Sequence, residues 1–330
     1  MKENPMRAPK PGWIDALAIA ICRPWVLILA AVLLLTPSPL LLAGLNSGAA
    51  FLKIGTGARP AALGGAYTAV AGDVDAMYYN PGGLANLSRR ELGATHAEWL
   101  LGTRFDFIGF AQPTANGTFG IGVTRLATGG QEGRDGNRQA TSGFEASDTA
   151  YTVSYSRKLT GSQASSLGGN LKLLRSQIGP YSAQTVAVDL GAQHRFADKP
   201  LSLGASVLNI GKGLRFLDQS DPLPLTLAIG AAYRIAGPLN LAFDIRRQVH
   251  DQRTDVGIGT EYAFLPSFAL RMGYASQYAG GPSGGGGAMG ALGGLGAGLG
   301  ISGRSYRADY TFTPFGALGN VQRLSLGARF

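Results

Sequence analysis

Apolar and polar side chains alternate with a period of two through most of the chain after residue 94. In the stretch from Leu239 to Arg246, Leu, Leu, Phe and Ile at odd positions oppose Asn, Asp and Arg at even positions. A period of two is typical of a β-strand, in which successive side chains point to opposite faces of the sheet. Because the opposing set contains full charges, it cannot face a dry core. The pattern predicts strands with one apolar face and one hydrated face.

About fourteen such runs follow one another along the chain. They lie near 95–101, 104–112, 117–127, 148–159, 167–178, 183–196, 201–210, 223–235, 239–249, 254–264, 267–277, 295–302, 304–314 and 320–330. Most have about 10 residues, the length that crosses a bilayer at a tilt, and bacterial outer-membrane barrels have an even number of strands. Soluble sandwiches usually have shorter strands and a dry interior. We therefore predict an all-β fold, a transmembrane antiparallel β-barrel of about fourteen strands over residues 95–330.

The two predicted rims of the barrel differ in their connections. The longest ones, 128–147, 211–222 and 278–294, all follow odd-numbered runs, and the even-numbered runs end mostly in tight links. Aromatic residues of the apolar faces gather at the short-turn ends of their strands: Phe196, Tyr233, Tyr262, Phe264, Phe268, Tyr306 and Phe330. Long loops on one rim and an aromatic girdle on the other are typical of outer-membrane barrels. Phe330, which closes an amphipathic last strand, resembles the signal read by the barrel-assembly machinery. We expect that machinery and outer-membrane lipid as partners.

Residues 1–49 predict a secretory signal peptide. A basic leader precedes an almost continuously apolar run at 25–42, and Ser47-Gly48-Ala49 offers the small residues that a signal peptidase requires. The run is nearly long enough to span a bilayer, but Pro37 and Pro39 argue against a regular transmembrane helix. We expect cleavage near Ala49 and localisation in the bacterial outer membrane. The single cysteine, Cys22, lies in this leader, so no disulfide is expected in the mature chain.

Residues 50–94 contain a compact stretch that we predict to be a hatch inside the barrel. Gly55 to Ala85 is crowded with Gly and Ala and carries only three charged side chains, Arg59, Asp73 and Asp75. Small residues let two backbones approach closely, and Asn80-Pro81-Gly82-Gly83 predicts a turn. We expect Asp73 to cap a helical turn that runs through Met77, and Arg59 to anchor the hatch through Asp73 or Asp75. The expected hatch residues are Arg59, Gly64, Gly65, Asp73, Asp75, Asn80, Pro81 and Gly82.

Phe51 to Ala85 resembles the opening segment of the PorV/PorQ family of bacterial outer-membrane proteins. The resemblance lies in Gly57-Ala58-Arg59, Gly64-Gly65-Ala66, Ala69-Val70-Ala71 and Asn80-Pro81. It implies a partner role in type IX secretion, in which the barrel receives cargo at the outer membrane and hands it to the surface attachment machinery, with secretion-system subunits and cargo as partners. The family is related to FadL-type transporters, which implies an alternative, passive transport of a hydrophobic ligand past a displaced hatch. The predicted loops hold few large apolar residues, and this favours the partner role.

Composition and charge add few further functions. Gly makes up 50 of 330 residues without a Gly-X-Y period, and a hydrophobic share of 45% argues against disorder. The net charge of +9 is scattered rather than clustered, so nucleic-acid binding is not expected. The polar faces of the strands predict a charged lumen wall formed by Asp189, Asp244, Glu261, Arg271, Arg307 and Asp309.

No catalytic or metal-binding motif accompanies these strands. The three histidines, His96, His194 and His250, fall in different predicted strands, so neither a triad nor a metal cluster is indicated. No nucleophile elbow or phosphate-binding loop is present. We therefore expect no cofactor, no metal and no enzymatic activity. A lipid-modifying enzyme of the outer membrane is the most distant alternative.

Overall fold

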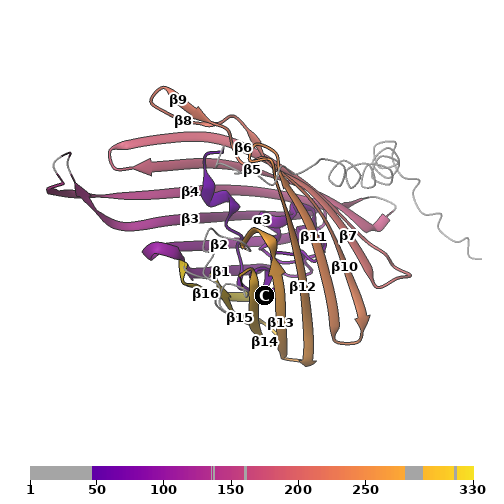
Figure 1. Ribbon diagram of the computed structural model, residues 1–330. Coiled ribbons are helices and arrows are strands. Elements are labelled where there is room, and N and C mark those ends of the chain that lie inside the picture. Colours follow the sequence, from indigo (N-terminus) through magenta and orange to yellow (C-terminus); the bar gives the residue numbers. More distant parts are fainter. Residues whose placement is uncertain (1–46, 135, 137, 160–161, 279–292, 316–317) are drawn as a thin grey trace, which may run out of the picture.

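A computed structural model describes residues 47–134, 136, 138–159, 162–278, 293–315 and 318–330 of the chain (Figure 1). Its wall is one closed antiparallel barrel of fourteen strands in the order β1-β16-β15-β14-β13-β12-β11-β10-β7-β6-β5-β4-β3-β2. The strands are β1 (Glu91–Glu98), β2 (Thr103–Thr114), β3 (Gly117–Arg134), β4 (Ala140–Leu159), β5 (Ser162–Ile178), β6 (Tyr181–Arg195), β7 (Leu201–Gly211), β10 (Thr226–Ala236), β11 (Leu239–Gln248), β12 (Arg253–Leu265), β13 (Phe268–Ala275), β14 (Leu295–Ser302), β15 (Tyr306–Pro314) and β16 (Asn320–Arg329). The predicted fold class and strand number are confirmed.

The barrel closes where its first strand meets its last. Glu91 of β1 pairs with Arg329 of β16, and the Phe330 amide donates to the Arg90 carbonyl. Closure leaves no unpaired sheet edge, which a strand that spans a membrane could not tolerate. We call the end of the barrel with Phe330 and the short turns the turn end, and the opposite end the loop end.

The outer surface of the barrel is apolar and its inner surface is polar. On β16 the side chains of Leu324 and Leu326 are 47% and 55% exposed, whereas their neighbours Arg323 and Ser325 are buried. The same separation holds on β13, where Leu270 and Met272 face out and Arg271 faces in. Such an inverted surface is stable only against hydrocarbon, as in a barrel that crosses a bilayer. Among the described residues, no helix has the length and apolarity needed to cross a membrane.

The largest differences from the predicted strand boundaries lie in the first five strands, and β5 begins at Ser162 instead of residue 167. The first strand begins at Glu91 instead of residue 95. Most of the loop expected at 128–147 is strand, since β3 continues to Arg134 and β4 begins at Ala140. This hairpin keeps pairing through two register shifts, a feature that strand periodicity alone does not reveal. The connection at 211–222 holds a small hairpin of β8 (Leu214–Phe216) and β9 (Gln219–Asp221), and 279–292 lies outside the described residues.

Residues 47–87, which we call the lumen segment, cross the interior of the barrel (Figure 1). The segment contains η1 (Ala50–Lys53), α2 (Ala58–Ala62), α3 (Ala76–Tyr79) and η2 (Pro81–Asn86). Helix α2 contacts β13 to β16, while η2 contacts β3 to β6 on the other side of the wall. Its start is held at the loop end, where the Gly48 amide donates to the Pro222 carbonyl at 2.9 Å. The chain then reaches β1 at the turn end.

Glycines of the wall make room for the lumen segment. A Cβ atom at Gly204 would lie 2.2 Å from the Thr68 carbonyl oxygen, and one at Gly191 would lie 2.2 Å from Asn80 Oδ1. At Gly273 the same addition would meet the backbone of Gly64, again at 2.2 Å. No side chain fits between such closely packed backbones. These wall glycines therefore allow the lumen segment to pack closely against the wall.

Candidate functional site

Asn80 joins the lumen segment to the wall. Its side-chain amide donates to the carbonyls of Thr68 and Ala192, both at 2.8 Å, and its Oδ1 accepts from the Gly82 amide at 3.1 Å. Asn80 is fully buried, and Pro81 fixes the following backbone at the start of η2. The structure thus places the predicted Asn-Pro turn against β6. The Gly82 backbone also lies against this strand, because a Cβ atom there would sit 2.9 Å from the Gly191 carbonyl oxygen.

A chain of ion pairs connects the lumen segment to the opposite side of the wall. Arg59 donates from Nε to Glu261 at 2.8 Å, and Arg271 donates to the same carboxylate at 2.6 Å. Arg271 also binds Asp309 at 2.6 Å, and Arg307 binds Asp309 at 2.9 Å. Paired and buried charges of this kind hold two surfaces in one fixed arrangement.

Arg307 continues this chain of ion pairs to the lumen segment. Its Nη1 lies 2.8 Å from Asp73 Oδ2, and the Tyr67 hydroxyl donates to the same oxygen at 2.6 Å. The expected pair of Arg59 with Asp73 is looser, at 3.8 Å, and the close partner of Arg59 is Glu261. The expectation that Asp73 caps a helical turn through Met77 is wrong, because α3 begins at Ala76 and the carboxylate of Asp73 is occupied by Arg307 and Tyr67.

The pKa values of two neighbouring carboxyl groups of the lumen segment, Asp73 and Asp75, are shifted in opposite directions. Burial alone would raise the pKa of Asp73, but the charges of Arg307 and Arg59 outweigh it and lower that pKa. Burial, and then the neighbouring charge of Asp73, raises the pKa of Asp75 to about 7. Arg307 reaches Asp75 only at 3.9 Å. Asp75 therefore takes up a proton near neutral pH while Asp73 stays ionised.

The remaining predicted wall residues bind backbone or neighbouring strands. Asp244 accepts hydrogen bonds from the amides of Tyr67 and Thr68, at 3.0 and 2.9 Å, so it holds the lumen segment directly. Asp189 pairs with Lys172 of β5 at 2.7 Å and accepts from the Asn209 amide at 2.7 Å. Its contacts lie within the wall, at the irregular pairing of β6 with β7. The structure brings the other five wall residues to the lumen segment or its ion pairs, but not Asp189.

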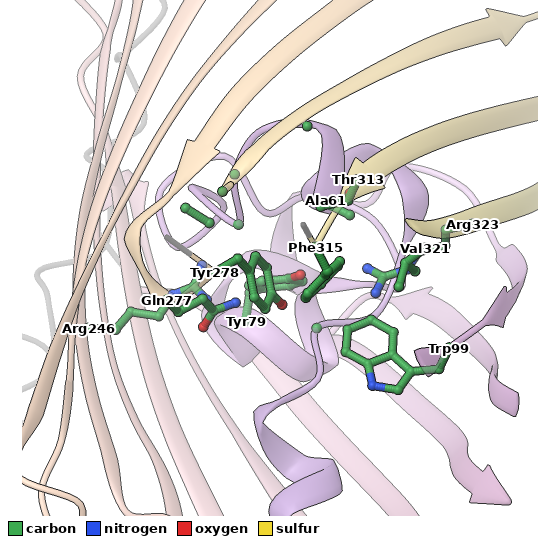
Figure 2. A pocket seen from close by; sticks show the side chains of 16 residues that line it. Ala61, Tyr79, Trp99, Arg246, Gln277, Tyr278, Thr313, Phe315, Val321 and Arg323 are labelled. Carbon is green, nitrogen blue, oxygen red and sulfur yellow. The ribbon is translucent and has the colours of Figure 1, made fainter. Parts of the chain in front are cut away.

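Aromatic side chains enclose a small cavity on the loop side of the lumen segment (Figure 2). We call it the aromatic cavity. Its volume is about 20 Å³, and its aromatic lining is Tyr79, Trp99, Tyr278 and Phe315. Phe315 lies between Trp99 and Tyr278, with ring centroids 5.4 and 4.6 Å away. Tyr79 comes from α3, Trp99 from the β1–β2 connection, Tyr278 from η4 (Ser276–Tyr278) after β13, and Phe315 directly follows β15. The lumen segment therefore forms one wall of the cavity.

Two guanidinium groups border the aromatic cavity. Arg246 lies 5.4 Å from the centroid of the Tyr79 ring, and Arg323 lies 5.7 Å from that of Trp99. Both are cation–π distances. The Arg323 side chain also donates to the Gly57 carbonyl at 3.2 Å. The two arginines therefore contact the aromatic rings, and Arg323 also binds the lumen segment.

A larger cavity opens on the turn side of the lumen segment. We call it the basic cavity, since Arg59, Arg195, Lys199 and Arg234 lie on its lining. Its volume is about 710 Å³, and its lining includes the β6–β7 turn and the turn-side parts of β10 and β11. The lumen segment therefore separates two spaces of very different size and lining.

Sequence reasoning named Arg59 and Glu261 of the basic cavity, but it missed Arg195 and Arg234 there and the four aromatic rings of the aromatic cavity. Trp99 and Phe315 fall in connections, and Tyr278 follows a strand, so no periodicity marks them. Arg195 ends β6 and Arg234 lies two residues before the end of β10, both at the turn end, where a charged residue is expected to be solvated. In the part of the chain that the structure describes, no group of three His, Cys, Asp or Glu side chains is arranged to hold a metal ion. His96 lies beside Asp106 on the outer face instead.

Two comparisons concern the sequence of the chain. Residues 47–210 match the model of a family described as "Uncharacterised protein family (UPF0164)". No curated protein matches the chain.

Similar solved structures are hydrocarbon transporters and channels. The toluene transporter TodX of Pseudomonas putida has a TM-score of 0.58 and 12% identity, with 84% of this chain and 99% of that chain covered. The CymD monoaromatic hydrocarbon channel has a TM-score of 0.56 and 12% identity, with 84% and 98% covered. At these identities the likeness shows a shared fold. This chain thus has the fold of a fourteen-stranded barrel like TodX, with a segment across its lumen.

Proposed function

We propose that this protein is an outer-membrane barrel through which small hydrophobic molecules pass, with the lumen segment closing the path as a hatch. The observation that carries the proposal is the aromatic cavity against Tyr79 of the lumen segment. Aromatic rings bind other apolar rings by burial and by edge-to-face contact. The fold shared with a toluene transporter and a monoaromatic hydrocarbon channel supports the same ligand class.

The aromatic cavity is too small to hold an aromatic molecule, as expected if the path is closed in this structure. A cavity of about 150 Å³ is large enough for benzene, whereas this one has about 20 Å³. An aromatic ligand must therefore displace a ring, and Phe315 contacts both neighbours. Beyond the ring lies the lumen segment, held to the wall by Asn80, Arg59 and Asp73. Passage requires that some of these contacts be released.

The cellular setting belongs to the same proposal. We propose export by a leader within residues 1–49, most of which lie outside the described residues, and insertion by the barrel-assembly machinery with Phe330 as part of the signal. Ser47 and Gly48, which cleavage near Ala49 would remove, bind Asp251 and Pro222 of the barrel, so we propose that cleavage falls before Ser47. Phe330 is 62% exposed at the turn end and stacks on Phe110 at 6.3 Å, where it would contact lipid at the interface. The type IX secretion role implied by the PorV/PorQ resemblance stays a prediction, because the comparisons favour the transport alternative.

Trp99 provides a direct test of this proposal. It is the only tryptophan in residues 47–330, and its ring lies in the aromatic cavity. We expect naphthalene, a neutral aromatic probe, to change the tryptophan emission of the leader-processed protein in nonionic detergent, since Trp13 and Trp25 are removed with the leader and Trp99 remains. Replacing Phe315 with alanine opens the cavity and should tighten binding by about tenfold.

Phe312→Ala is the matched control, since Phe312 faces outward and is 37% exposed. It should bind naphthalene as the parent does. Emission that is indifferent to naphthalene in both the parent and Phe315→Ala would refute a site for neutral aromatic molecules in this cavity.

A further inference from the structure

We propose that the basic cavity is a binding site for a small polyanion, a molecule with two or more phosphate or carboxylate groups. The site lies on the turn side of the lumen segment, away from the aromatic cavity, and is independent of the proposed transport of neutral molecules. At about 710 Å³ it has room for a small organic molecule. Val70 and Gly72 of the lumen segment form part of its lining.

The cavity holds more positive than negative charge. Its lining has four cationic side chains, Arg59, Arg195, Lys199 and Arg234, and two acidic ones, Asp198 and Glu261. The Glu261 carboxylate is already bound by two guanidiniums, that of Arg59 and that of Arg271 outside the lining. Asp198 is exposed on the β6–β7 turn. An excess of positive charge therefore remains at the cavity.

Arg195 and Arg234 carry most of that excess. The Nη2 atom of Arg195 donates to the Ala71 carbonyl at 3.2 Å, and Nε of Arg234 donates to Asn240 Oδ1 at 3.3 Å. Within the described part of the chain, no carboxylate oxygen lies within 4.0 Å of either guanidinium. Arg59, Arg195 and Arg234 line the same cavity; Arg195 is half-buried and Arg234 is exposed. Like charges gathered around one concave space attract an anion, which relieves their mutual repulsion.

The arrangement suits a polyanion better than a single small ion. Arginine presents a planar fork of donors that binds phosphate or carboxylate through two hydrogen bonds at once. Arg195 ends β6 and Arg234 lies near the end of β10, and the Arg234 amide donates to the Pro200 carbonyl of the β6–β7 turn at 2.9 Å. The two forks therefore stand on the same rim, on the two strands that flank β7, and each can take a different anionic group of the same molecule.

Isothermal titration of the purified full chain with tripolyphosphate, and separately with citrate, tests the proposal. We expect binding that weakens as salt is raised, because the contacts are ionic. The double variant Arg195→Gln, Arg234→Gln should bind at least about tenfold more weakly than the parent. Its naphthalene response at Trp99 should be unchanged, which separates failure of this site from failure of the transport proposal.

A second double variant controls for loss of surface charge. Lys158→Gln with Arg304→Gln removes two exposed cations from the same rim but outside the cavity. It should bind both anions as the parent does. Equal weakening in the two double variants would mean general charge attraction only and would overturn the proposal. So would a parent protein that binds neither anion, with a heat-dependent gel mobility showing that its barrel is folded.

Discussion

Replacing Asn80 with alanine tests whether the lumen segment is held in the barrel by specific contacts. The substitution removes three hydrogen bonds, to the carbonyls of Thr68 and Ala192 and from the Gly82 amide. It leaves two buried carbonyl oxygens with one partner fewer, and it loosens the turn before Pro81. The strands themselves keep all their pairings, so the barrel should still assemble.

The magnitude follows from the number of bonds. A buried hydrogen bond contributes about 1 kcal/mol net, and only the bond to the Ala192 carbonyl joins the segment to the wall, since Thr68 and Gly82 belong to the segment itself. Since about 1.4 kcal/mol changes an equilibrium tenfold, the loss of this bond alone should raise the population with a released segment by about fivefold. A cavity left by the shorter side chain would add to this cost.

Planar-bilayer conductance and amide hydrogen exchange measure the released population. We expect more frequent or larger openings in Asn80→Ala, and faster exchange in residues 62–85 with unchanged protection in the strands. Asn320→Ala, at an exposed position where β16 begins, is the control and should behave as the parent does. Parent-like conductance together with parent-like exchange in Asn80→Ala would refute the reasoning that Asn80 holds the segment.

Two further perturbations address the same docking. A Cβ atom at Gly204 would lie only 2.2 Å from the Thr68 carbonyl oxygen, so Gly204→Leu should expel the lumen segment and expose it to protease. Gly303→Ala is the control and should leave the segment protected, because the nearest atom to its new Cβ lies 3.8 Å away. Asp75 has an ordinary pKa of 3.8 when free and a pKa of about 7 when docked, so it stabilises docking below the lower value and loses this contribution as pH rises through about 7. The segment should therefore be better protected from protease at pH 5 than at pH 8. Asp75→Asn should reduce this difference in protection between the two pH values. If the difference in Asp75→Asn equals that of the parent, Asp75 is not its cause.

Local sequence patterns placed some of the site residues but could not identify the partners of the charged ones. Asn80 and Pro81 could be placed in a turn because their backbone preferences are local. The partners of the charged residues could not be placed in this way. Arg59 binds Glu261, and Asp73 binds Arg307, across about 200 positions or more of sequence. Which carboxylate meets which guanidinium depends on the strand order and on the depth of the segment in the lumen.

The sequence by itself determined the wall of this protein. Period-two alternation fixes which side chains face out, because a strand has no other way to place them, and fourteen such runs with short and long connections in turn specify a closed barrel. Only the tertiary structure decided what lies inside. The aromatic cavity takes its rings from four distant parts of the chain, and the basic cavity arises because β6 and β10 become near neighbours when β8 and β9 leave the barrel order. These sites exist only through packing between segments that no local pattern relates.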